Sequence, residues 1–138
     1  VAVARIDAPD GTKHGGHKHV SDPWPTDLRY SKETKQLTVT FDDGVEHALP
    51  AEYMRVYSPS AEVRGHGADE RKIVPGRRHI GIMKIEQVGN YAVRLHFDDL
   101  HDTGLFTWAY LRELGEKHTE WWAQYLADLE TRNLSRDP

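Results

Sequence analysis

The chain has 138 residues, of which 38% are hydrophobic and 29% are charged, and its formal net charge is −4. This composition predicts one soluble domain with a single core, and the negative charge argues against nucleic-acid binding, which relies on a basic face. The sequence contains no cysteine, so disulfides, thiol nucleophiles and thiolate metal sites are excluded. No apolar run approaches the roughly 18 residues that span a bilayer, and no signal-peptide pattern opens the chain. We therefore expect a cytoplasmic protein that binds neither membrane nor nucleic acid.

The first 26 residues predict a flexible tail, because glycine, proline, aspartate and histidine occur there without a periodic apolar pattern. Three histidines of this tail, His14, His17 and His19, could bind a transition metal, since imidazole nitrogens suit nickel, copper and zinc. The alternative is a polar tail in which nothing fixes the geometry of the three side chains.

A β-strand is predicted over residues 37–41, where leucine, valine and phenylalanine alternate with threonine. The turn after it decides which residues of the next strand face the core. A two-residue loop at Asp43 and Gly44 would put the apolar faces of the two strands on opposite sides. A three-residue loop with a left-handed Gly44 pairs Phe41 with Val45 and brings the apolar faces together, so we choose it.

A short helix is predicted over residues 50–56, because Pro50 lacks the N–H group that a first helical turn leaves unpaired. Residues 57–79 then form a long connection, and a loop of this length in a small domain is usually functional or mobile. The connection concentrates cationic side chains, which could be a solvated face or a surface for an anion or a partner. The residues singled out for the second role are Arg64, Arg77 and Arg78.

The second half of the chain repeats this pattern. A hairpin is predicted over residues 80–97, with its turn at Gly89 and Asn90. By analogy with the first half, residues 98–100 form the next turn and place His101 on the core side. Leucine is a poor left-handed residue at the position where the first turn has glycine, so a differently built second turn stays open.

Two helices are predicted near the end of the chain. Thr107 is suited to cap a helix that runs to Leu114, and Gly115 is suited to end it. The next helix carries large apolar residues at helical spacing on one face: Trp121, Trp122, Tyr125, Leu126 and Leu129. The adjacent tryptophans could form a binding platform, although such residues usually pack into a core because of their large apolar area.

These elements predict an α+β fold: a small, mainly antiparallel sheet built from two similar β-hairpin-plus-helix units and covered on one face by helices. The two units begin with Phe-Asp-Asp at residues 41–43 and 97–99, an offset of 56 residues. The predicted domain spans residues 27–132, and residues 133–138 form a C-terminal tail. An exposed edge of such a small sheet could pair with a second copy of the chain and give a homodimer.

No catalytic residue can be named from the sequence, because no serine lies on a nucleophile turn and no glycine-rich loop lies between a strand and a helix. The acidic pairs Asp42–Asp43 and Asp98–Asp99 could be catalytic or metal-binding carboxylates. Their place in hairpin turns favours a simpler role, in which aspartate caps its own turn by accepting backbone hydrogen bonds.

Three motifs in the order Leu49–Arg55, Ser58–Gly67 and His101–Trp108 resemble the gamma-butyrobetaine hydroxylase-like N-terminal domain family, also called domain of unknown function 971. The similarity covers roughly residues 27–130. In the family's eukaryotic hydroxylases, this domain holds a structural zinc through three cysteines and one histidine. The resemblance places Ser58, Ser60, Val63 and His101 at these four positions. Only the histidine is a zinc ligand, so the four-ligand site is incomplete.

The resemblance implies a non-catalytic accessory or interaction module with a protein partner. The family's domain also accompanies P-loop ATPase scaffolds of iron–sulfur cluster assembly, which implies a link to iron–sulfur or iron-enzyme systems. The hydroxylase activity of the family belongs to a separate domain. One alternative is a metal-binding protein that holds zinc or iron with His101, His66 and His79. Another alternative is an enzyme that acts on a small anion, and its only support is analogy at the level of the fold.

Overall fold

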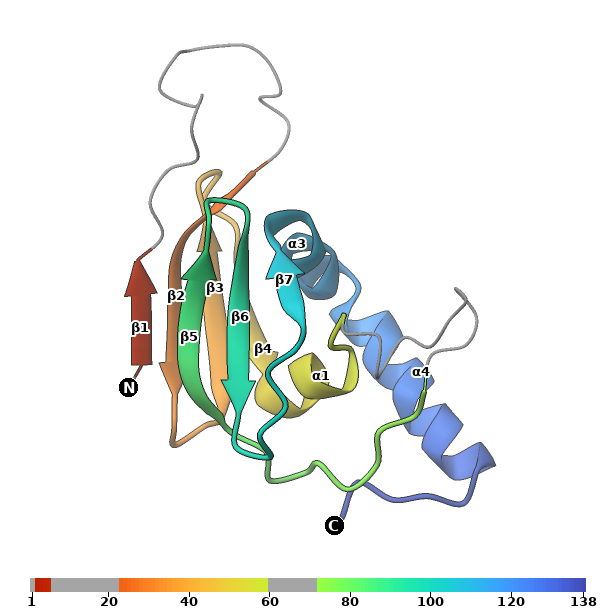
Figure 1. The fold of residues 1–138 in the computed structure, drawn as a ribbon. Coiled ribbons are helices and arrows are strands. Elements are labelled where there is room, and N and C mark those ends of the chain that lie inside the picture. The colour runs from red at the N-terminus through yellow and green to blue at the C-terminus, as the bar shows by residue number, and fades with distance from the viewer. Residues whose placement is uncertain (1, 6–22, 60–71) are drawn as a thin grey trace.

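The structure is a computed structural model that describes residues 2–5, 23–59 and 72–138. Its strands are β1 Ala2–Arg5, β2 Pro25–Ser31, β3 Gln36–Phe41, β4 Glu46–Pro50, β5 Ile82–Val88, β6 Ala92–Phe97 and β7 Leu105–Thr107. Its helices are α1 Ala51–Val56, α3 Trp108–Glu116 and α4 His118–Thr131 (Figure 1). Among the described residues, no helix is long and apolar enough to cross a bilayer.

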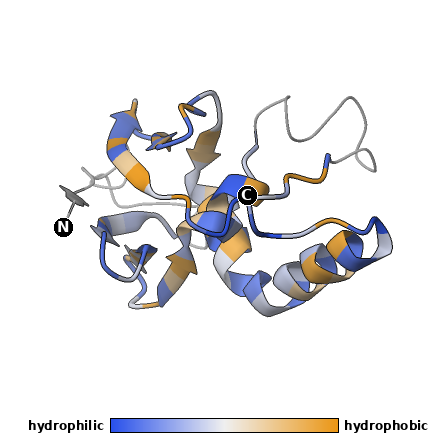
Figure 2. Ribbon diagram, turned by 90° about the horizontal axis from the view of Figure 1, so that it is seen from below, coloured by the Kyte–Doolittle hydropathy of each residue, from blue (hydrophilic) through white to orange (hydrophobic). Residues whose placement is uncertain are grey.

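The strands form two antiparallel sheets, β1-β2-β3-β4 and β5-β6-β7. Seen along the strands, the two sheets lie opposite each other, and the helices lie on the side away from the N-terminus (Figure 2). The α+β class and the antiparallel pairing are confirmed, whereas the expected single sheet is corrected to two. The division arises because β4 leads into α1 and the long connection, so each half pairs only its own strands.

The N-terminal residues differ from the predicted flexible tail. Strand β1 pairs with β2, with Ala2 opposite Tyr30 and Arg5 opposite Asp27. The fold therefore uses the start of the chain as an edge strand, and β2 begins at Pro25, slightly before the predicted boundary. The three tail histidines lie outside the described residues.

The turn between β3 and β4 confirms the three-residue loop. The Phe41 amide donates to the Val45 carbonyl at 2.8 Å, and Gly44 has a left-handed φ of +90°. Leu37 consequently pairs with Leu49, as the matching of apolar faces requires.

The turn between β6 and β7 has the same construction, although its third residue is a leucine. The Phe97 amide donates to the His101 carbonyl at 3.1 Å, and the Leu100 amide donates to the Phe97 carbonyl at 3.0 Å. Leu100 has a φ of +70°, and 81% of its surface is exposed. Hairpin closure therefore overrides the preference of leucine, and the alternative of a different turn is wrong.

The similarity of the two halves extends to the strand before each hairpin. The Asp42 amide donates to the Trp24 carbonyl, and the Asp98 amide donates to the Gly81 carbonyl, both at 2.9 Å. The register of β2 shifts between Pro25 and Asp27, and that of β5 shifts between Ile82 and Lys84. In each half, a preceding strand, β2 or β5, thus pairs with the first strand of the hairpin that carries the Phe-Asp-Asp turn.

The core lies between the two sheets and the helices. All six residues of α1 are buried, so this short helix is enclosed by the rest of the molecule. The fully buried side chains come from both halves, among them Leu28, Leu37, Val39, Leu49, Tyr53 and Met54 from the first and Val93, Phe97, Phe106, Leu111 and Leu114 from the second. Neither half could bury its apolar residues alone.

Two tyrosines join the halves by hydrogen bonds to helix ends. The Tyr53 hydroxyl on α1 donates to the Leu114 carbonyl on α3 at 2.7 Å. The Tyr110 hydroxyl on α3 donates to the Tyr57 carbonyl at the end of α1 at 2.6 Å. The last carbonyls of a helix have no hydrogen-bond donor within the helix, so each helix supplies a tyrosine hydroxyl that donates to the end of the other.

The boundary of α3 differs from the prediction at its end. The Thr107 hydroxyl accepts from the Tyr110 amide at 3.1 Å, which confirms the N-cap. The helix continues through Gly115 to Glu116 instead of ending at the glycine. A Cβ atom on Gly115 would lie 2.2 Å from Cδ2 of His47, so glycine is needed there for the close approach of β4.

Helix α4 packs with the face that its spacing predicts, except at one residue. Tyr125 and Leu129 are buried, and the ring of Trp121 stacks on Tyr57 with 5.2 Å between centroids. Trp122 also packs against the core, so both tryptophans act as packing residues. Leu126, which was predicted on the same face, is exposed.

The two turns make opposite predictions for a glycine exchange. Replacing Leu100 by glycine should raise the free energy of unfolding by about 0.5–1 kcal/mol, because relief of the left-handed strain exceeds the entropy cost of glycine. Replacing Gly44 by alanine should lower it by about 1 kcal/mol. Apart from the chain neighbours of Gly44, no atom of the described residues lies within 4 Å of the new methyl group, so the second effect reports the backbone alone. Urea denaturation measures both, and a loss of stability in Leu100→Gly would contradict the strain.

Candidate functional site

The carboxylate of Asp99 joins three separate segments at the turn between β6 and β7, which is called the second turn below. Its Oδ2 accepts from Arg55 Nε of α1 at 2.8 Å and from Arg77 Nε of the long connection at 2.9 Å. Its Oδ1 accepts from the His101 amide at 3.1 Å, which closes the turn. The turn therefore has the predicted Asp cap and also anchors the helix and the connection.

The electrostatics of this cluster favour the charged forms. Partial burial alone would raise the pKa of Asp99, but the hydrogen bonds from Arg55, the His101 amide and Arg77 outweigh it and hold the pKa below its ordinary value of 3.8. The side chain of Arg55 is almost fully buried, and its Nη1 has no hydrogen-bond partner among the described residues. Asp99 is thus the counter-charge on which buried Arg55 depends.

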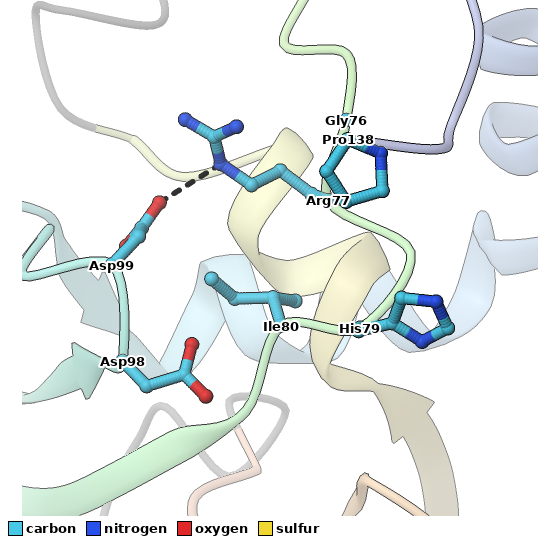
Figure 3. Close-up of a pocket in the computed structure, with 7 residues that line it drawn as sticks. All are labelled: Gly76, Arg77, His79, Ile80, Asp98, Asp99 and Pro138. Carbon is cyan, nitrogen blue, oxygen red and sulfur yellow. Dashed lines mark hydrogen bonds and ion pairs between the residues drawn. The ribbon is translucent and has the colours of Figure 1, made fainter.

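A pocket of about 280 Å³ opens beside this cluster (Figure 3). Its lining consists of Gly76, Arg77, His79, Ile80, Asp98, Asp99 and Pro138. Asp98 accepts from the Gly81 amide at 3.1 Å, and Ile80 is the buried apolar residue of the lining. Arg77 and His79 lie in the same lining as the carboxylates of Asp98 and Asp99. The lining therefore does not favour a small anion as the ligand.

The imidazole of His101 is buried, as expected from its place after the turn. Its Nε2 lies 3.0 Å from the hydroxyl of Ser58, which is fully buried. Gly104 makes room for this contact, because a Cβ atom there would lie 2.3 Å from the serine oxygen. The structure therefore brings together two of the four positions that the family resemblance aligned with zinc ligands.

The three histidines proposed as metal ligands are in different situations. His101 is engaged with Ser58, and His79 is exposed at the pocket. His66 lies outside the described residues. Within residues 2–5, 23–59 and 72–138, no three histidine, aspartate or glutamate side chains gather where a metal ion could be held.

The arginines proposed as a partner surface are tied to the protein itself. Arg77 donates to Asp99 and, through Nη1, to the Pro75 carbonyl at 3.1 Å. Arg78 forms an ion pair with Asp137. Arg64 lies outside the described residues. The two described arginines thus hold the long connection in place, and only part of their charge faces solvent.

Sequence reasoning missed that the acidic turns form ion pairs between the two halves. Asp43 of the first turn binds Arg112 of α3, with contacts of 3.1 and 2.9 Å, while Asp99 of the second turn binds Arg55 of α1. The signal was present in the repeat, because the offset that aligns the two aspartates also aligns the two arginines after one inserted residue.

Comparison with known proteins gives a family and several similar structures. The model of the family described as gamma-butyrobetaine hydroxylase-like, N-terminal matches residues 28–112. Two solution NMR structures are 44% and 42% identical, cover 84% and 90% of this chain and 91% and 92% of their own, and have TM-scores of 0.74. No curated protein matches the chain.

A third structure is a crystal structure from Acidithiobacillus ferrooxidans, described as a protein of unknown function of the family called domain of unknown function 971. It is 37% identical, with a TM-score of 0.57, and the match covers 67% of this chain and 92% of that one. The similarity therefore extends over most of the chain in sequence and in fold.

The role of Asp99 can be tested by its dependence on pH. Because its folded-state pKa lies below 3.8, the ionised carboxylate stabilises the fold above pH 3.8, and this contribution is lost as the pH falls through the lowered pKa. Asp99→Asn should reduce the free energy of unfolding at pH 7 by about 1–3 kcal/mol, because buried Arg55 loses its charged partner. Urea denaturation between pH 2 and 7 should show the two curves converging in acid.

Asp102→Asn is the matched control for this comparison, because Asp102 is an exposed aspartate three residues further along whose Oδ2 lies 3.7 Å from Nδ1 of His96. An equal loss of stability in both variants would show that Asp99 has no special role.

Proposed function

The chain belongs to the gamma-butyrobetaine hydroxylase-like N-terminal family. We propose that it is a non-catalytic interaction module that binds a protein partner through the turn between β6 and β7. The contact residues we propose are Leu100, Arg77, which donates to Asp99 next to it, and the arginines Arg64 and Arg78 of the long connection. We also propose a cytoplasmic location and, from the family resemblance, a link to iron–sulfur or iron-enzyme systems.

The observation that carries this proposal is the conformation of Leu100. A large apolar side chain is 81% exposed on a residue held at φ +70°. The left-handed conformation costs a leucine roughly 1–2 kcal/mol, and exposure returns no packing energy. Strained residues that gain nothing for the fold are common at binding sites. A partner that buries the Leu100 side chain would contribute hydrophobic free energy that offsets the cost of the left-handed conformation.

The surroundings of Leu100 suit a protein surface better than a small substrate. The adjacent residues combine carboxylates with arginines, so the rim can make charge-assisted hydrogen bonds around a central apolar contact. Asp99 is fixed from three sides, and the turn is therefore presented rigidly, which lowers the entropy cost of binding. A second copy of the chain is one candidate partner, because both sheets end in edge strands.

The proposal predicts that partner affinity depends on Leu100. Leu100→Asn removes the apolar side chain, and asparagine tolerates the left-handed conformation, so the turn should persist. For a partner captured by the wild-type protein and then purified, the dissociation constant should rise at least about tenfold, or 1.4 kcal/mol. Calorimetric titration measures it.

Leu126→Asn is the control for surface hydrophobicity, because Leu126 is an exposed leucine on α4. It should bind like the wild type. If Leu100→Asn also binds like the wild type, the second turn is not the contact surface.

We infer a metal-binding function as the second candidate. Its support is the meeting of Ser58 and His101, whose Oγ and Nε2 atoms are 3.0 Å apart at two positions that the family resemblance aligned with zinc ligands. A serine hydroxyl is a poor zinc ligand, so a site for zinc or iron would need further imidazoles, for which His66 and His79 are the proposed sources.

This candidate predicts about one zinc or iron ion per chain in untagged protein purified anaerobically, and loss of that metal in His101→Gln. His96→Gln is the control, because His96 instead pairs with Glu86 at 2.9 Å. Elemental mass spectrometry gives the stoichiometry. Metal that is sub-stoichiometric and removed by dialysis would contradict the candidate.

A further inference from the structure

The last residues of the chain are bound to the long connection much as a separate peptide would be. After α4, the carbonyl of Ser135 accepts from the Gly76 amide, and the carbonyl of Arg136 accepts from the Arg78 amide, both at 3.0 Å. Arg78 also pairs with the carboxylate of Asp137. These residues, predicted as a C-terminal tail, are anchored through both main-chain and side-chain contacts.

The main anchor is the guanidinium of Arg136. Its Nε and Nη2 atoms donate to the two carboxylate oxygens of Glu52 at 2.8 and 2.6 Å. Its Cζ atom lies 5.3 Å from the centroid of the Trp122 ring. A two-pronged carboxylate contact together with an aromatic face is specific for arginine, because lysine offers neither the planar fork nor the same stacking.

The carboxylate of Glu52 lies in the first turn of α1 and has Arg136 as its hydrogen-bonded partner. The side chain of Glu52 is only 6% exposed, and burial of a charge without a partner is costly. The equivalent position in the second half is Ala109, which is exposed on α3 and carries no charge. The acidic residue is therefore a property of the first helix alone, where α4 and the end of the chain cover it.

We propose that Glu52, the ring of Trp122 and the segment 76–78 form an arginine site for an extended segment of a partner protein. The segment carries an arginine followed by an acidic residue. In the structure, the chain's own Arg136 and Asp137 fill the site, so the partner must displace them. The main-chain hydrogen bonds hold any such segment, Glu52 and Trp122 select the arginine, and Arg78 selects the acidic residue that follows.

This inference deepens the proposed interaction function, because Arg78 belongs to both surfaces. The two can fail separately. Leu100→Asn tests the hairpin surface and leaves Glu52 and Trp122 intact, whereas Glu52→Gln removes the arginine site and leaves the second turn intact.

The test uses the full chain with Arg136→Ala and the peptide acetyl-Leu-Ser-Arg-Asp-Pro-amide. The variant should bind the peptide with shifts of the Gly76 and Arg78 amide resonances in NMR spectra. The wild-type protein should bind it at least about tenfold more weakly, because its own arginine competes at a millimolar effective concentration. A peptide with citrulline in place of arginine, and the double variant Arg136→Ala with Glu52→Gln, are the controls, and neither combination should bind.

Absence of peptide binding by folded Arg136→Ala overturns the proposal, as does equal binding of the citrulline peptide. Equal affinity of wild type and variant shows that Arg136 does not occupy the site, and it overturns the proposal too. If Arg136→Ala does not fold, Arg136→Lys provides the same comparison, since lysine keeps the charge and loses the two-pronged contact. Binding of the arginine peptide to that variant, with weaker binding to the wild type, supports the site.

Discussion

The two halves of the molecule hold each other's helices at their C-terminal ends. The Tyr53 hydroxyl satisfies the Leu114 carbonyl of the second half, and the Tyr110 hydroxyl satisfies the Tyr57 carbonyl of the first. A buried carbonyl left without a partner would cost about 1–3 kcal/mol, so neither helix could be enclosed without the other. This exchange explains how α1, with only six residues, stays helical inside the core, since an isolated helix of that length would not persist.

The ion pairs between the halves are arranged in the same reciprocal way but contribute differently. Asp43 with Arg112 is the more exposed pair, and exposed pairs contribute little to stability because solvent screens their attraction. Asp99 with Arg55 is the more buried pair, and removal of either partner would leave the other as a buried charge without a counter-charge. The tyrosine bonds and the shared core therefore carry most of the stability, and the ion pairs fix the position of each turn over the other half's helix.

The candidate sites lie where the two halves differ. The second turn has a strained, exposed leucine at the position of Gly44, and Asp99 there binds an additional arginine from the long connection. The first helix carries Glu52 under the end of the chain, whereas its counterpart Ala109 is free of charge and exposed. These two differences between corresponding positions are where we propose the binding surfaces.

The sequence by itself determined the features that depend on neighbouring residues. The register of the first hairpin, the cap at Thr107 and the buried face of α4 follow from turn chemistry and apolar spacing. The division into two sheets and the anchoring of Arg136 on Glu52 depend on the tertiary structure and could not be read from the sequence. In these cases a local preference yields to contacts between distant segments. The sequence offers many arginines and carboxylates that could pair, and only the packed core brings particular ones within hydrogen-bond distance.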